Sequence, residues 1–148
     1  MTAMPDSAQR TDALHAARSR LIDAFGEVEG ELVSILRTSD AKILIAPLSQ
    51  KIGAVRKVAP SPQYSKSRRD AVHNALDKLG GLLARRAEIA HSPMFFVRII
   101  GETEERAGFR NPSTQPTIGD TMTLYRRQDL LDLTKEVRAI AKELAGQA

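Results

Sequence analysis

The sequence contains no cysteine and no tryptophan, and it has only four phenylalanines and two tyrosines. Without cysteine the chain can form neither disulfide bonds nor thiolate metal sites, and it has no thiol nucleophile. With so few aromatic side chains we do not expect a base-stacking platform for single-stranded nucleic acid. No apolar run approaches the ~18 residues of a membrane-spanning helix, and the N-terminal stretch lacks the apolar core of a secretion signal. We therefore expect a cytoplasmic protein with no membrane contact.

The composition is that of a soluble globular domain. Of the 148 residues, 42% are hydrophobic and 27% are charged, which is ordinary for this class. A chain of this length can bury roughly two thirds of its unfolded surface without help from disulfide bonds or metal ions. We therefore predict a single domain over residues 1–148, with a frayed tail at residues 1–6.

Positive charge is concentrated in the middle of the chain. The net charge is +4, but residues 51–91 contain nine Lys or Arg and three Asp or Glu, a balance of +6, so the remainder sums to −2. Such a distribution can steer a polyanion to one face. The alternative is a solvated helix face with no ligand. We predict that RNA binds through six cations of this segment, which are Lys51, Arg56, Lys57, Lys66, Arg68 and Arg69.

Apolar residues recur every three or four positions in several stretches, and this spacing predicts amphipathic helices. We expect a long first helix over 7–37, a second from Pro47 to about residue 58, a third over 67–91 and a last helix over 127–144. A capping box of Ser67 and Asp70 is expected to open the third helix, and the glycine pair at 80–81 to kink it.

Residues 94–122 have a different character. The segment MFFVRII has strand propensity, the following GETEERAGFR indicates a short hairpin, and NPSTQPTIGD has the composition of a loop. We therefore predict an all-α fold, a four- to five-helix bundle with a short β-hairpin/loop insert at 94–122 before the last helix.

Gly26 and Gly30 lie one turn apart within the first helix. Each glycine should cost about 1 kcal/mol relative to alanine, so we expect them to allow the close approach of another helix. That neighbour can belong to the same chain or to the first helix of a second subunit.

One short segment, LLARRAEIAHSPM, brings cations and a titratable group together at the end of a helix. His91 lies in the last turn before Pro93, and Glu88 on the same face could orient its ring or stabilise its charge. Arg86 lies five residues before His91, which is roughly 140° around and about 7.5 Å along a regular helix. The two side chains therefore meet only through a kink, an unwound helix end, or the reach of the arginine stem.

If Arg86 and His91 converge, they can cleave a phosphodiester without a metal. His91 can take the proton of a ribose 2′-OH, Arg86 can stabilise charge on the phosphate, and Arg85 can grip the backbone. Cleavage needs an acid as well as a base, which two copies of His91 in a dimer would provide. In the alternative, Arg86 pairs with a carboxylate and His91 caps the helix. The sequence has no pair of ligands with metal-site spacing, so we expect no metal or other cofactor.

The segment ARRAEIAHSPM resembles the Arg-Asn-x-x-Ala-His signature of HEPN domains (higher eukaryotes and prokaryotes nucleotide-binding), with Arg86 and His91 at the signature positions. The order of the long first helix with FGEVEGEL, the PLSQKIGAVRK helix, an irregular insert and the final helix also resembles bacterial members. The resemblance implies a helical homodimer whose two Arg/His motifs meet across a cleft. Active members of this family cut RNA without metal, often as toxins or in antiviral defence, which implies a cognate antitoxin-like partner.

One position departs from the family pattern. The residue after the signature arginine is usually Asn or another polar residue, and it is Ala87 here. Other members of the family have lost activity and serve as binding modules. The sequence therefore leaves two functions open, a metal-independent endoribonuclease and an inactive dimeric module that binds a protein or nucleotide partner.

Overall fold

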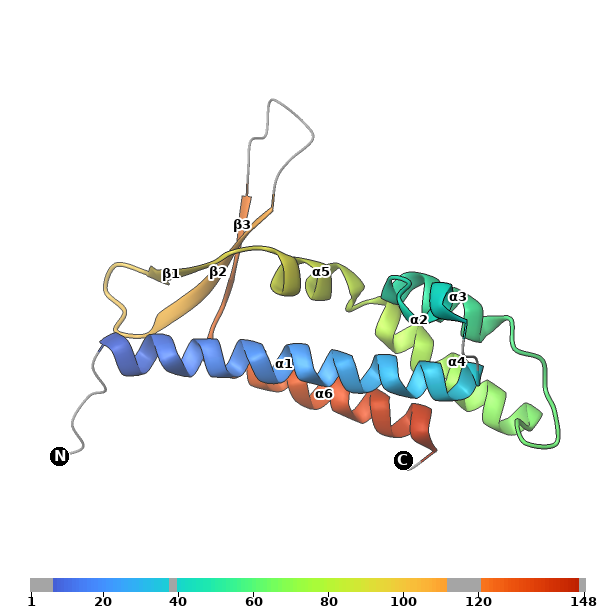
Figure 1. Ribbon diagram of the computed structural model, residues 1–148. Helices are drawn as coiled ribbons and strands as arrows, with labels where there is room; N and C mark the ends of the chain where they lie inside the picture. The colour runs from blue at the N-terminus through green and yellow to red at the C-terminus, as the bar shows by residue number, and fades with distance from the viewer. Residues whose placement is uncertain (1–6, 38–39, 112–120, 147–148) are drawn as a thin grey trace. The chain divides into compact units, whose positions relative to one another are not determined.

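The computed structural model describes residues 7–37, 40–111 and 121–146 (Figure 1). In this part of the chain it has six helices and one three-stranded antiparallel sheet, so the fold is mostly helical and belongs to the α+β class. The predicted helical majority and the insert before the last helix are confirmed, but the all-α class is wrong. The elements in chain order are α1 (Ser7–Leu36), α2 (Ala41–Leu44), α3 (Leu48–Arg56), α4 (Lys66–Gly80), α5 (Leu83–His91), β1 (Met94–Arg98), β2 (Glu105–Asn111), β3 (Thr121–Tyr125) and α6 (Arg127–Ala145).

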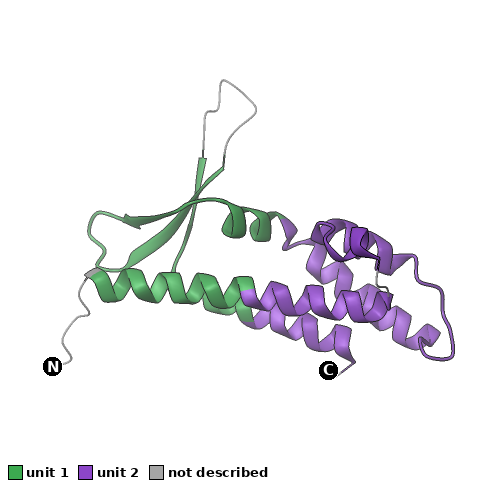
Figure 2. Ribbon diagram, in the orientation of Figure 1, with its two compact units in different colours: residues 1–22, 84–134 green, residues 23–83, 135–148 purple. Residues whose placement is uncertain are grey.

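The chain divides into two compact units, coloured separately in Figure 2. Unit 1 is formed by residues 1–22 and 84–134, and unit 2 by residues 23–83 and 135–148. The long helices α1 and α6 each contribute one part to each unit. Their predicted bounds are confirmed, because an uninterrupted helical spacing of apolar residues specifies a helix strongly.

Unit 1 contains the sheet, whose strand order is β1-β2-β3. The predicted hairpin is confirmed as β1 and β2, with Met94 opposite Phe109 and Arg98 opposite Glu105. The third strand was not predicted, because the sequence before it has the composition of a loop. Its last residue, Tyr125, is buried opposite Ala107, and this packing stabilises the strand. The other buried apolar side chains of unit 1 are Leu14, Ala17, Leu21, Ile89, Phe109, Leu130 and Leu133.

Unit 2 is helical, and its core follows the predicted apolar stripes. The buried residues include Phe25, Val28 and Leu32 from α1, Leu48, Ile52 and Val55 from α3, Val72, Leu76 and Leu79 from α4, and Val137, Ile140 and Leu144 from α6. The predicted capping box is wrong, because the residue at the start of α4 is Ser65, whose hydroxyl accepts the Arg68 N–H at 3.0 Å. The predicted third helix is divided, since α4 ends at Gly80 and α5 begins at Leu83.

The two glycines of α1 have no close neighbour in the described part of the chain. A Cβ atom added at Gly26 or Gly30 would meet nothing within 4 Å, so the expectation of a close helix within the same chain is wrong. The alternative, a second subunit at this face, stays a prediction.

Three further expectations concern the N-terminal tail, the loop after β2 and the absence of a membrane-spanning helix. The predicted frayed tail at 1–6 and most of the predicted loop, residues 112–120, lie outside the described residues. Among the helices that are described, none is long and apolar enough to span a membrane.

Candidate active site

The helix α5 positions the predicted site. Its sequence, LARRAEIAH, consists mainly of strong helix formers, and its one fully buried residue, Ile89, anchors it in the core of unit 1. The helix ends at His91 because Pro93 disfavours helical geometry at Ser92. The last turn closes where the Ser92 N–H donates to the Glu88 carbonyl at 3.0 Å. The predicted end of the helix before Pro93 is confirmed.

Arg86 and His91 are in contact. The distance between Arg86 Nη1 and His91 Nε2 is 3.3 Å, although five residues separate them. Both residues belong to the same short helix. The interruption of helical structure between α4 and α5 lies before it, at residues 81–82. The long arginine stem therefore bridges the offset that a regular helix imposes. Of the three ways in which the two side chains could converge, the structure shows this one.

The contact has a chemical requirement. A guanidinium only donates hydrogen bonds, so Arg86 can bond to Nε2 only when this nitrogen has a lone pair. In the tautomer with its proton on Nδ1, Nε2 is the acceptor of this contact.

Glu88 is directed to the sheet. Its carboxylate accepts hydrogen bonds from the Tyr125 hydroxyl and the Thr123 hydroxyl, both at 3.3 Å. Thr123 also accepts from Asn111 Nδ2 at 2.6 Å, so the network joins α5 to β3 and β2. This places Glu88 as an anchor of the helix, and its predicted role in orienting His91 stays a prediction.

The anchor changes the chemistry of Tyr125. Burial, together with the charge of Glu88 and the hydrogen bond to it, raises the pKa of Tyr125 to about 12. The positive charge of Arg85 acts in the opposite direction and is the smaller influence. Arg85 itself is exposed next to Arg86, as a residue that contacts a polyanion must be.

Arg18 on α1 holds the end of α5, and the sequence analysis missed it. Its Nε donates to the Ile89 carbonyl at 2.9 Å and its Nη2 donates to the Ser92 carbonyl at 3.2 Å. Its guanidinium also lies 5.8 Å from the centre of the Phe109 ring. Arg18 thus satisfies carbonyls that a helix end leaves without partners. A signal was present, because Arg18 lies four residues after Leu14 and three before Leu21, on the apolar stripe of α1.

Most of the six cations predicted to bind RNA make contacts within unit 2. Lys51 is buried, and its Nζ lies 3.2 Å from Glu29 Oε2. Arg56 pairs with Asp77 at 2.8 Å, and Arg69 donates to the carbonyls of Val58 and Arg56 at 3.0 and 3.2 Å.

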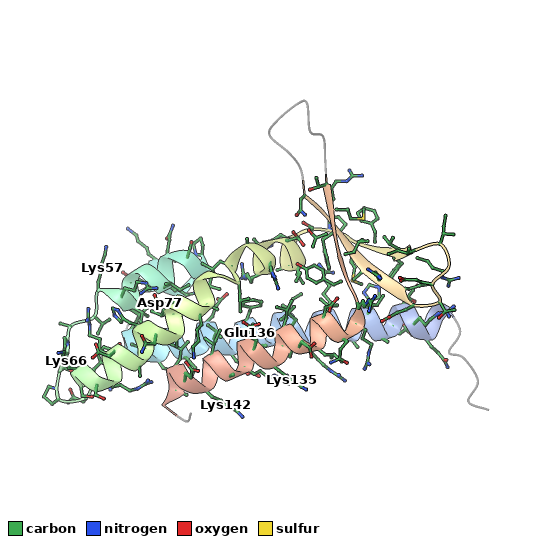
Figure 3. The ribbon with its side chains drawn as sticks, turned by 180° about the vertical axis from the view of Figure 1, so that it is seen from behind. Lys57, Lys66, Asp77, Lys135, Glu136 and Lys142 are labelled. Carbon is green, nitrogen blue, oxygen red and sulfur yellow. The ribbon has the colours of Figure 1, made fainter. Side chains whose placement is uncertain are left out.

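Arg68 has a comparable structural contact. It donates to the last carbonyls of α6, those of Glu143 and Leu144. Lys57 and Lys66, labelled in Figure 3, are exposed at the end of α3 and the start of α4. The predicted RNA contact of all six stays a prediction, and the geometry favours these two lysines for it.

The residues described here include no group of three or more His, Cys, Asp or Glu placed to hold a metal ion. Comparison of the chain with protein-family models, with curated proteins and with solved structures gives no match.

Proposed function

We propose that this protein is a metal-independent RNA endonuclease of the HEPN type, which acts as a dimer with a composite Arg/His site. The observation that supports this most directly is the contact of 3.3 Å between Arg86 and His91 at an exposed helix end. The proposed context is that of a toxin or defence ribonuclease with a cognate antitoxin-like protein.

The proposed reaction is an internal transesterification. Neutral His91 takes the proton of the ribose 2′-OH, and the 2′-oxygen attacks the adjacent phosphorus. The bond from phosphorus to the 5′-oxygen breaks, and this oxygen takes a proton from His91 of the second subunit. Once His91 is protonated, its contact with Arg86 is lost, because both groups are then donors. The guanidinium can then stabilise the charge on the phosphate.

A second function is favoured by one observation. Ala87, which follows the signature arginine, is exposed and offers no polar group beside the phosphate site. In this alternative the protein is a catalytically inactive dimeric module that binds a protein or nucleotide partner. Both functions use the same dimer, so only chemistry at His91 separates them.

The test is cleavage of single-stranded RNA in the presence of a chelator. Wild type should leave a 2′,3′-cyclic phosphate and should not cut DNA, which lacks the attacking hydroxyl. His91→Ala should reduce the rate by ~10²–10⁴, the usual contribution of a positioned acid or base. Helicity should be unchanged, because an exposed imidazole leaves no cavity in the core. His15→Ala, at an exposed position of α1, is the matched control.

Three results would discriminate between the functions. Loss of cleavage in His91→Ala but not in His15→Ala supports the enzyme. Equal cleavage by wild type and His91→Ala contradicts it and indicates a contaminating nuclease. No cleavage by wild type, with activity restored in Ala87→Asn, supports the binding module on a degenerate site.

A further inference from the structure

The two faces of the sheet in unit 1 are different. Because side chains alternate along a strand, Ala107, Phe109 and Tyr125 share one face, and all three are buried. The opposite face, here called the outer face, is formed by Phe95, Val97, Arg106, Gly108, Arg110, Met122 and Leu124. Two of its apolar residues, Phe95 and Met122, are 40% and 43% exposed. The outer face therefore presents apolar surface to the solvent.

At the centre of the outer face, apolar side chains pack closely around Gly108. A Cβ atom at Gly108 would lie 2.7 Å from Met122 Sδ, 3.1 Å from Val97 Cγ2 and 3.3 Å from Leu124 Cδ2. These three side chains therefore close over the glycine, which lies directly opposite Phe95 in the register. A planar group on the Phe95 ring would have apolar atoms beside it.

The charged residues of the outer face are all basic. Its seven residues include Arg106 and Arg110 and no acid. Arg106 is paired with Glu102 at 2.9 Å. The guanidinium of Arg110 lies 5.9 Å from the centre of the Phe95 ring. An exposed ring beside a guanidinium is the combination that binds single-stranded nucleic acid, since the ring stacks on a base and the cation contacts the backbone. This charge complementarity favours a polyanion over an apolar peptide.

The outer face is close to the candidate site along the chain. Only Ser92, Pro93 and Met94 separate His91 from Phe95. Four extended residues span at most ~14 Å. One short stretch of single-stranded RNA can therefore reach both His91 and Phe95. The small number of aromatic residues argues against an extended platform, but a subsite for one base needs only one ring.

We propose that the outer face is a subsite for one unpaired base of the RNA, stacked on Phe95, with Arg110 contacting the backbone. This inference rests on the proposed function, because it assigns single-stranded RNA as the substrate class of the same site. A stacked base accounts for about 1–3 kcal/mol by alanine substitution, so its loss should weaken binding roughly 5- to 150-fold.

Two neighbouring phenylalanines provide a matched pair for the test. Phe96 is 41% exposed, like Phe95, but points to the opposite face, where its ring meets His15 edge-on with the ring centres 5.3 Å apart. Binding is measured by fluorescence anisotropy with a single-stranded RNA whose 2′-hydroxyls are methylated, so that no cleavage can occur. Phe95→Leu should weaken binding 5- to 150-fold, and Phe96→Leu should not. Arg110→Gln, which keeps the ring, should also weaken binding.

The outcomes separate this inference from the proposed function. Equal affinities for wild type, Phe95→Leu and Arg110→Gln, with His91-dependent cleavage intact, would overturn the subsite and leave the enzyme. Binding that depends on Phe95, in a protein that cleaves no RNA, would support the subsite and contradict the enzyme. Equal binding of double-stranded and single-stranded RNA would also overturn the subsite, since a paired base cannot stack on the ring. Retained helicity of the variants confirms that they are folded.

Discussion

Replacing Arg18 should detach the end of α5 from α1. Arg18→Met keeps most of the apolar stem but removes the donors to the Ile89 and Ser92 carbonyls. Hydrogen bonds from a charged donor contribute about 1.5–3 kcal/mol each, and partial exposure of both places them at the low end of that range. The contact with the Phe109 ring adds about 0.5–1 kcal/mol, part of which the methionine sulfur replaces. We expect a loss of roughly 3–4 kcal/mol.

The matched control is Arg20→Met. Arg20 is exposed on the same helix, and surface substitutions usually change the free energy of unfolding by less than ~0.5 kcal/mol. Urea denaturation followed by circular dichroism measures both variants. Hydrogen exchange at the Ser92 amide, which donates to the Glu88 carbonyl, reports on the last turn of α5 itself. Exchange there should accelerate in Arg18→Met only. Equal stability and equal exchange in the two variants would refute the role of Arg18.

Two further predictions concern α1 and the anchor of α5. Gly26→Ala should stabilise a single chain by about 0.5–1 kcal/mol, because its Cβ meets nothing in the described part of the chain. Gly26→Leu should weaken the predicted dimer, which light scattering measures. Unchanged association of this variant would contradict an interface at Gly26. The folded-state pKa of Tyr125, about 12, exceeds its unfolded value of ~10, so its stabilisation is complete below pH ~10 and is lost towards pH 12. Tyr125→Phe should flatten that decline in unfolding free energy, and an identical decline would implicate another group.

The predictable part of the fold was the part with a local signal. α1 and α6 have apolar residues at helical spacing over their whole length, so their bounds followed from the sequence. β3 has only five residues after a loop-like sequence, and its place in the sheet depends on pairing with β2 and burying Tyr125. Likewise, Ser65 and Ser67 are both plausible helix caps in the sequence, and only the backbone geometry selects Ser65.

The contact between the two candidate site residues could not be predicted from the sequence. Arg86 and His91 were identified from the sequence, but a helical wheel places them apart, and the reach of one flexible stem joins them. Glu88 was expected beside His91, yet its partners on β3 are 35 and 37 residues away in the sequence. A contact over such a separation leaves no local pattern from which it could be read.

The arginines show why net charge is a poor guide to where this protein would bind RNA. Arg18, Arg68 and Arg69 donate to backbone carbonyls, the first two at the C-terminal ends of α5 and α6. A positive charge is favourable at the C-terminal end of a helix, where the helix dipole is negative. The N–H groups of these arginines already donate to carbonyls. Their charge still contributes to the field that attracts a polyanion, but they are not positioned to grip one. The exposed cations are better placed for direct contact, and they include Lys57 and Lys66 in unit 2 and Arg85 and Arg110 in unit 1.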